Sequence, residues 1–297
     1  MSNKNKVTVS SVDANRKMVR FVESGVRLIE HSRTCLSEGI GRNKNKSEIG
    51  KYYVLYELLN SLEESCGSLI CLSRDGMNNI PKGHWNLRDI YIISRSVFEI
   101  VINCLFIVAK GDETVEKATA HYMQKVNRNT KRNLKIGEFS VGLEYFGRNS
   151  FKELDGFEKA MKDYTSKHGK EKNAWTEESI VKKLEDINKQ WDFKSLRVLQ
   201  CALLFFYGDA TEISHGTFYG SMFLKGYDSP NIRILSAEDD LIRNGERLFV
   251  LLFHIEASIL SLVEIFISEF KLIDLDTKKI SLEYKRVNKD FFNFISE

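Results

Sequence analysis

The chain has very little proline, with only Pro81 and Pro230 among its 297 residues. Because proline breaks the interior of a helix, this scarcity allows long uninterrupted helices. No segment keeps the alternation of apolar and polar residues that a half-buried strand requires, and no internal repeat is found. Apolar residues make up 42% of the chain, which excludes wholesale disorder and allows a sizeable core. The sequence therefore predicts an all-α protein.

Cysteine is also scarce, and its pattern excludes the common zinc sites. The five cysteines are odd in number and lack metal-ligand spacing, and Cys104 and Cys201 lie in apolar runs typical of a core. The opening MSNKNKVTVS lacks the apolar stretch of a secretory signal. Phosphate-binding, dinucleotide-binding, serine-hydrolase and zinc-protease motifs are missing as well. We therefore expect a cytoplasmic protein without a cofactor or a metal.

The chain has no strong excess of one charge, because it contains 44 basic and 41 acidic residues. Locally, however, QKVNRNTKRNLK (124–135) holds five basic residues and no acidic one. Such a stretch can bind a phosphate backbone, which makes Lys125, Arg128 and Arg132 candidate substrate-binding residues. The alternative is a solvated helix face.

One apolar run, 248–267, is long enough to span a membrane. It also contains His254, Glu256 and Glu264, and carboxylates are costly in lipid. We interpret the run as a buried core helix and expect no membrane partner.

The hydrophobic pattern predicts a bundle of about eight or nine helices in three segments. Residues 1–47 hold a loose polar tail (1–10), a first helix and a basic linker, GIGRNKNKS (39–47). Residues 48–220 form the helical core, and residues 221–297 add C-terminal helices that pack on it. The predicted helices cover 12–37, 48–73, 85–110, 113–136, 151–168, 176–189, 196–218, 237–270 and 277–296, with loops at 74–83 and 137–150 and a turn at GYDSPN (226–231).

The third predicted helix carries a polar stripe on an otherwise apolar surface. Its members fall within an arc of roughly 80° on a helical wheel: Arg88, Ile92, Arg95, Glu99 and Asn103. A helix that is apolar on nearly every side lies inside its bundle, so the stripe points into protein or a cleft. A buried charge must be paired, and a buried ion pair is weak evidence for stability, so the Arg95–Glu99 pair invites a functional account. The alternative is a structural ion pair that fixes helix register.

The helix at 196–218 repeats this arrangement. One of its faces gathers Tyr207, Thr211, Ser214, His215 and Phe218. Histidine titrates near neutral pH, so His215 is the candidate for proton transfer, and the neighbouring hydroxyls can orient it or bind a substrate. The alternative is a satisfied core histidine, which is our interpretation of His254.

Three motifs resemble those of a widespread, functionally uncharacterised bacterial helical family. RDIYIISRSVFEIVINCLFI (88–107) resembles its R-S-x-x-E-x-x-x-N helix, NAWTEESI (173–180) its Trp-x3-Ser-Ile motif, and YGDATEISHG (207–216) its Tyr-x3-Ser/Thr-x3-His motif. The resemblance covers roughly residues 50–220. It singles out Arg95, Glu99, Asn103, Trp175, Tyr207, Thr211 and His215.

That family is similar to HEPN proteins, which are all-α and often dimeric. Many of them are RNases of toxin–antitoxin, abortive-infection and antiphage systems. The resemblance implies a HEPN-like core, a homodimer with paired active sites at its interface, and a partner protein from a defence system. The chain departs from the usual HEPN motif, Arg-x4–6-His on one helix, because Arg95 and His215 lie 120 positions apart.

An RNase of this kind needs a base, an acid and a cation, but no metal. His215 would be the base or acid, Arg95 would bind the phosphate, and Glu99 would orient either of them. Further substrate contacts are expected from Asn103, Tyr207, Thr211 and Ser214. Two alternatives stay open: a non-catalytic helical module that binds a partner protein or a small ligand, and a nucleotide-sensing defence component.

Overall fold

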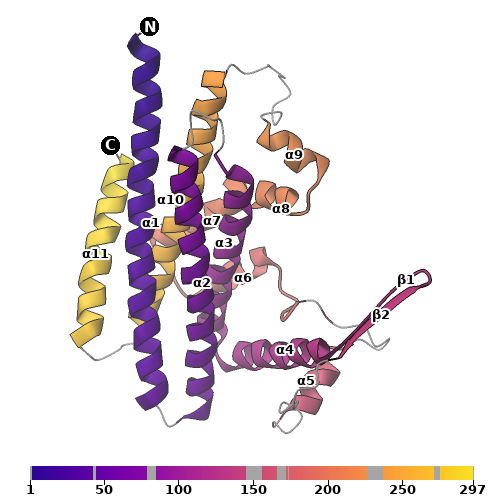
Figure 1. Ribbon diagram of the computed structural model, residues 1–297. Helices are drawn as coiled ribbons and strands as arrows, with labels where there is room; N and C mark the ends of the chain where they lie inside the picture. The colour runs from indigo at the N-terminus through magenta and orange to yellow at the C-terminus, as the bar shows by residue number, and fades with distance from the viewer. Residues whose placement is uncertain are drawn as a thin grey trace.

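Long helices form most of the structure, which is a computed structural model. It describes residues 2–42, 45–78, 85–144, 156–165, 172, 174–225, 237–270 and 275–296. The all-α prediction is confirmed, apart from one small hairpin. The bundle consists of α1 (Ser2–Arg42), α2 (Lys46–Asn78), α3 (Leu87–Lys110), α10 (Ala237–Glu269) and α11 (Leu275–Ser296) (Figure 1). Shorter helices cover one side of it: α6 (Ile180–Asn188), α7 (Lys194–Ala202), α8 (Gly208–Ser214) and α9 (Phe218–Leu224).

The core is centred on α10, which packs against α1, α3, α7 and α11. Leu251, Leu252 and Ile255 of this helix are fully buried. One cluster of buried side chains joins residues from all three predicted segments of the chain. Two described helices, α3 and Asp239–Glu269 within α10, are long and apolar enough to cross a membrane, but most of each apolar stretch is buried within the fold. Core helices commonly have this composition.

The first two helices are longer than the sequence predicts. The tail at 1–10 and the linker at 39–47 were expected to lack regular structure, yet α1 extends from Ser2 to Arg42 and α2 begins at Lys46. Glycine lowers helix propensity by about 1 kcal/mol, but packing can override this cost, and Gly39 lies against the ring of Tyr52. The predicted turn at 226–231 and part of the loop at 74–83, with both prolines, lie outside the described residues.

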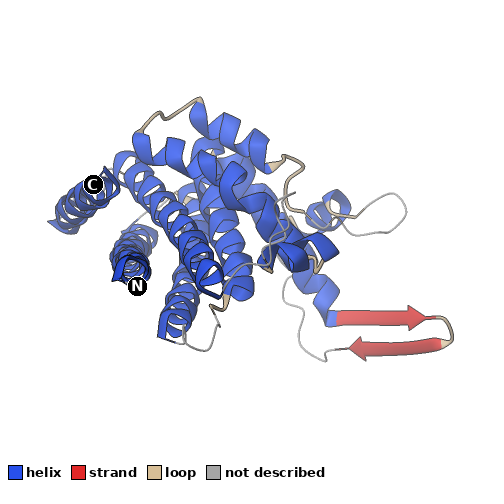
Figure 2. Cartoon of the chain, turned by 90° about the horizontal axis from the view of Figure 1, so that it is seen from above, coloured by secondary structure: helices blue, strands red, loops and turns tan. Residues whose placement is uncertain are grey.

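A β-hairpin replaces the predicted end of the fourth helix and the loop after it. Helix α4 (Asp112–Thr130) leads into β1 (Lys131–Ile136), which pairs antiparallel with β2 (Phe139–Glu144). Gly137 has φ 59° at the first position of the two-residue turn, a conformation that suits tight hairpins. The hairpin projects from the bundle as an arm, beside α5 (Phe157–Asp163) (Figures 1 and 2).

The predicted helix at 196–218 is interrupted. Helix α7 continues into a π-helical turn, η3 (Leu203–Tyr207), then into α8, and a break at Gly216 precedes α9. The helices are therefore more numerous than the eight or nine predicted. Apolar residues in this segment also occur on sides of the helix that the fold does not bury, so Leu204 and Phe205 are exposed. Cys201, expected in the core, is exposed for the same reason.

Candidate functional site

The polar stripe of α3 meets α8 through Arg95. The Arg95 Nε donates to Glu99 Oε1 over 2.9 Å, and its Nη1 donates to Ser214 Oγ over 2.7 Å. The structure thus brings together two segments that lie 119 positions apart in the sequence. The Arg95 side chain is 24% exposed and that of Glu99 is 37% exposed, so the pair is accessible to a ligand.

Tyr207 completes this network from the end of the π-helical turn. Its hydroxyl donates to Glu99 Oε1 over 2.8 Å, the same oxygen that Arg95 contacts. Burial, and then the hydrogen bond to Glu99, raise the pKa of Tyr207 to about 12. The phenol is therefore a stable donor at neutral pH. The extra residue of a π-helical turn shifts side chains around the helix axis, and such turns are frequent at functional sites.

The charge of Arg95 is maintained in this position. Burial alone would lower the pKa of Arg95. The charge of Glu99 and the hydrogen bond with Tyr207 have a larger effect in the other direction, so the pKa of Arg95 is raised. The guanidinium also lies over the Tyr207 ring, 5.6 Å from the ring centre. Arginine has more N–H donors than these contacts use, so it can still bind an anion.

Lys183 adds a second cation, which the sequence analysis missed. Its Nζ donates to Asn103 Oδ1 over 2.8 Å and lies 4.8 Å from the centre of the Trp175 ring. The residue is 7% exposed. Desolvation lowers the pKa of Lys183, although the charges of Glu178 and Glu99 oppose this effect. A signal was present in the sequence, because Lys183 shares a helix face with the apolar Ile180, Leu184 and Ile187.

The second motif positions this lysine. Ser179 is the N-cap of α6, since its side chain accepts a hydrogen bond from the Lys182 backbone N–H. Trp175, just before that cap, also packs against Phe106 of α3, with 6.1 Å between the ring centres. Residues from all three motifs therefore line one side of α3.

His215 lies at the edge of this site. It is exposed at the C-terminal end of α8, and its imidazole makes no hydrogen bond or ion pair with any described residue. Its neighbour Ser214 makes the contact with Arg95. The Thr211 hydroxyl donates to the Tyr207 carbonyl oxygen over 2.8 Å, within its own helix. His254 lies in the core as expected, and burial lowers its pKa.

The basic segment at 124–135 belongs to another part of the molecule. Lys125 and Arg128 lie on α4, which leads away from α3 (Figure 1). The Lys125 Nζ donates to the Lys172 carbonyl oxygen over 2.9 Å. Arg132 belongs to β1, and its side chain is not among those described. The predicted substrate-binding residues are thus divided between the α3 site, α4 and the arm.

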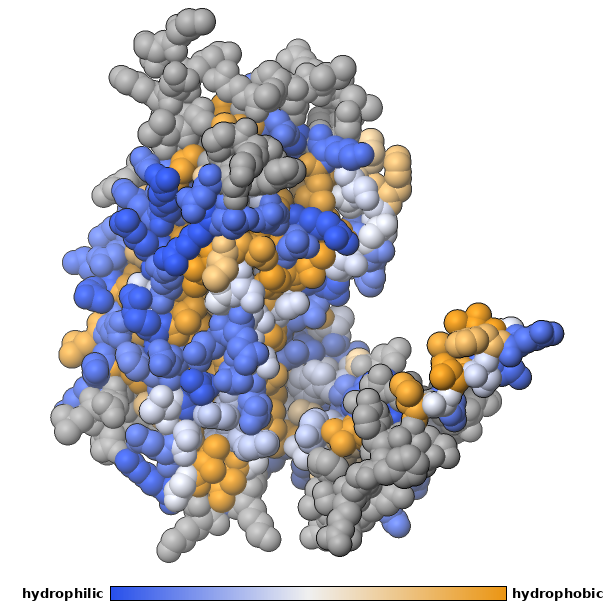
Figure 3. Space-filling model, in the orientation of Figure 1, coloured by the Kyte–Doolittle hydropathy of each residue, from blue (hydrophilic) through white to orange (hydrophobic). Residues whose placement is uncertain are grey.

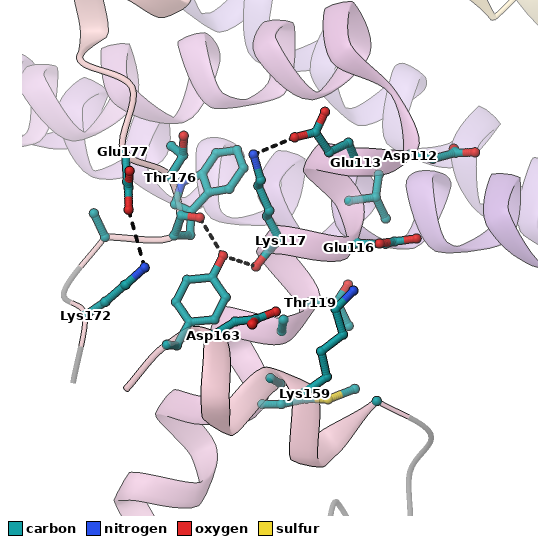
Figure 4. Close-up of a pocket in the computed structure, with 18 of the residues that line it drawn as sticks. Asp112, Glu113, Glu116, Lys117, Thr119, Lys159, Asp163, Lys172, Thr176 and Glu177 are labelled. Atoms are coloured by element: carbon teal, nitrogen blue, oxygen red, sulfur yellow. Dashed lines mark hydrogen bonds and ion pairs between the residues drawn. The ribbon is translucent and has the colours of Figure 1, made fainter. Parts of the chain in front are cut away.

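A pocket of about 1000 Å³ lies between α4, α5 and the segment before α6. Lys117 pairs with Glu113 over 2.7 Å, and Lys172 pairs with Glu177 over 3.3 Å (Figure 4). The Tyr164 hydroxyl lies 2.7 Å from the Trp175 carbonyl oxygen. Trp175 therefore lines this pocket and also contacts Lys183. Among the described side chains, no three metal-binding groups gather at one point.

Comparisons with known proteins place more than half of the chain in one family. Residues 52–226 match the model of a family of unknown function, DUF5677. This range contains α3, α6 and α8, which carry the network around Arg95. Neither a curated protein nor a solved structure matches the chain.

Proposed function

The chain belongs to DUF5677, a family of unknown function, and we propose that it is a metal-independent endoribonuclease. The observation that supports this best is the guanidinium of Arg95, which Glu99 and Ser214 hold at the junction of α3 and α8. A guanidinium fixed in this way can bind a phosphate through two parallel N–H groups. Lys183 supplies a second positive charge further along α3.

RNA carries its own nucleophile, the 2′-hydroxyl beside each phosphate. In the proposed reaction the neutral imidazole of His215 takes the proton of that hydroxyl. The 2′-oxygen attacks phosphorus and the bond to the 5′-oxygen breaks. The imidazolium then returns the proton to the 5′-oxygen, which leaves a 2′,3′-cyclic phosphate and a 5′-hydroxyl. Arg95 and Lys183 stabilise the negative charge that develops on the phosphorane.

The position of His215 is compatible with this role. It directly follows Ser214, whose hydroxyl accepts a hydrogen bond from Arg95. Because its side chain is exposed, a strand that lies over α8 can reach the imidazole. Lys125 and Arg128 would guide the same strand along α4. The wider role we propose, an effector of a bacterial antiphage or abortive-infection system, follows from the HEPN resemblance of the three motifs.

A second function, recognition of an anionic ligand without catalysis, is favoured by one observation. The described residues include no partner that orients the His215 imidazole, whereas Arg95, Tyr207 and Lys183 all have fixed contacts. A site that only binds needs the fixed groups and no proton carrier. The two functions differ in their dependence on His215.

The test is cleavage of a single-stranded RNA, labelled at its 5′ end, by the purified protein in the presence of EDTA. We expect Arg95→Ala to lower the cleavage rate by a factor on the order of 100, typical for loss of one transition-state donor. His215→Ala should abolish cleavage, and Lys183→Met should reduce it. The released end should be a cyclic phosphate.

The matched control is Arg197→Ala, which removes an exposed arginine that pairs with Asp192 over 2.6 Å. Thermal melts establish that every variant is folded. Equal cleavage by the wild type and all three site variants would refute the proposal. If the wild type cleaves nothing, yet RNA raises its melting temperature and does not do so for Arg95→Ala, the second function holds.

A further inference from the structure

The pocket between α4, α5 and the segment before α6 has no part in the proposed reaction (Figure 4). Its volume of about 1000 Å³ is large enough for a small organic molecule. The α4 residues that line it extend from Asp112 to Met123, which corresponds to roughly 16 Å along the helix axis. A long, narrow ligand therefore suits this pocket. In Figure 3 the arm projects beside the same part of the molecule.

Carboxylates outnumber ammonium groups among the described residues that line the pocket, with six acidic side chains and three lysines. Two of the lysines are already paired, Lys117 with Glu113 and Lys172 with Glu177. Lys159 is the third lysine. The four remaining carboxylates form no ion pair within the described parts of the chain: Asp112, Glu116, Asp163 and Glu178. Four negative charges against one positive charge leave the lining with an excess of three negative charges at neutral pH.

This negative charge acts on Tyr164, a pocket residue that is 7% exposed. Burial is the largest effect and raises the pKa of Tyr164. The charge of Lys117 lowers that pKa, whereas the charges of Asp163, Glu177 and Glu178 raise it further. Carboxylates from α5 and from the segment before α6 therefore act on the same wall of the pocket.

The acidic groups are distributed along the pocket. Among the described side chains no three metal-binding groups meet at one point, and a divalent metal ion needs several oxygen ligands around one centre. This distribution favours a ligand whose positive charges are separated from one another. The lining also contains apolar side chains on which an aliphatic chain can pack, and these are Val115, Ala120, Met123, Ala160 and Trp175. A tryptophan ring additionally attracts ammonium groups.

We propose that this pocket binds a linear polyamine, in which ammonium groups alternate with methylene chains. The ammonium groups pair with carboxylates such as Glu116 and Asp163, and the methylene groups pack on Met123 and Trp175. The ring of Trp175 also lies 4.8 Å from Lys183 Nζ, so the ligand contacts a residue that borders the α3 site. The binding does not depend on RNA cleavage, because the proposed reaction assigns no step to any residue that lines the pocket.

The test is isothermal titration calorimetry of the RNA-free protein with spermidine at constant ionic strength. We expect one spermidine per chain. Asp163→Asn and Glu116→Gln should each weaken binding by a factor on the order of ten, the effect of losing one hydrogen bond to a charged group. The matched control is Glu158→Gln, which neutralises an exposed carboxylate of α5 outside the pocket and should leave the affinity unchanged. Thermal melts show that every variant is folded.

Further measurements separate this site from a general attraction of polyamines to acidic groups. Butylamine has a single ammonium group and should bind far more weakly than spermidine, and magnesium chloride at equal ionic strength should not displace spermidine. Spermidine should also change the tryptophan fluorescence of the wild type but not that of Trp175→Phe.

The absence of spermidine binding would overturn the proposal. So would an equal loss of affinity in Glu158→Gln, butylamine binding as tight as that of spermidine, or displacement by magnesium. A fluorescence change that persists in Trp175→Phe would place the ligand elsewhere and would overturn it as well.

Discussion

Glu256 is a carboxyl group in the core of α10 that is fully buried. Neither of its oxygens has a hydrogen-bond partner among the described residues. Desolvation raises the pKa of Glu256 well above its usual value, and the charge of Arg27 opposes this only in part. The folded state therefore favours the protonated acid. The resulting stability is fully present below the unfolded pKa of about 4.3 and is lost as the pH rises through the higher folded pKa.

We expect Glu256→Gln to remove this loss of stability at rising pH, because an amide does not ionise. The variant should melt at a higher temperature than the wild type at pH 7 and above, and the two should converge near pH 4. The measurement is a series of thermal melts between pH 4 and 9. Glu264→Gln is the contrast, since Glu264 accepts hydrogen bonds from Tyr284 and Ser195. It should destabilise the protein at neutral pH. A Glu256→Gln variant with the wild-type pH slope would contradict this account.

The residues of the site were partly visible in the sequence. Helical periodicity placed Arg95, Glu99 and Asn103 on one face of α3, and the structure shows this face turned toward α6 and α8. Periodicity does not reveal which distant segments meet, so the contact of Arg95 with Ser214 could not be derived from it. Lys183 was overlooked because a lysine in a charged sequence such as VKKLED usually belongs to a solvated face.

At the scale of single elements, Tyr207 is the last residue of the π-helical turn η3. A π-helical turn contains one more residue than the α-helical turn it replaces. Leu204 lies in this turn and is largely exposed, so its loss removes little packing. We expect deletion of Leu204 to convert the turn to α-helix and to leave Tyr207 directed toward Glu99, because the turn is then completed with one residue fewer.

The hydrogen bond from Tyr207 to Glu99 should therefore remain, and the phenol should stay buried. The pKa of Tyr207 should stay at about 12, above the ordinary value near 10. The measurement is an alkaline ultraviolet titration, with Tyr207→Phe to identify the contribution of this tyrosine. Helix content should be unchanged. If the titration of this tyrosine falls toward pH 10 in the deletion variant, the extra residue is itself needed to position Tyr207.

The arm and the π-helical turn show why some elements could not be derived from the sequence. A basic segment such as KRNLKI fits an amphipathic helix as well as a short strand, and the strand becomes visible only when paired with FSVGLE. Likewise, an unbroken apolar run gives no sign of one inserted residue. Long elements with clear periodicity were predicted closely, as α10 shows with its observed bounds of Ala237–Glu269 against a prediction of 237–270.

At the scale of the whole molecule, one core joins the helices into a single unit. Its buried residues come from α1, α2 and α3 near the N-terminus and from α10 and α11 near the C-terminus. Composition predicted this class of fold, but it did not predict that α1 and α10 would pack against each other. Such packing joins distant parts of the chain, so a destabilising substitution at its centre should lower the free energy of unfolding of the whole fold.

Leu252→Ala tests this connection, because Leu252 is fully buried in α10. Removal of a buried leucine side chain costs about 2–5 kcal/mol of stability, through lost burial and the remaining cavity. We expect urea unfolding, followed by circular dichroism and by tryptophan fluorescence, to shift to lower urea as one coincident transition. The same change at Leu282, which is exposed on α11, should cost less than about 0.5 kcal/mol. Separate transitions from the two probes would mean that the helices around α10 unfold independently.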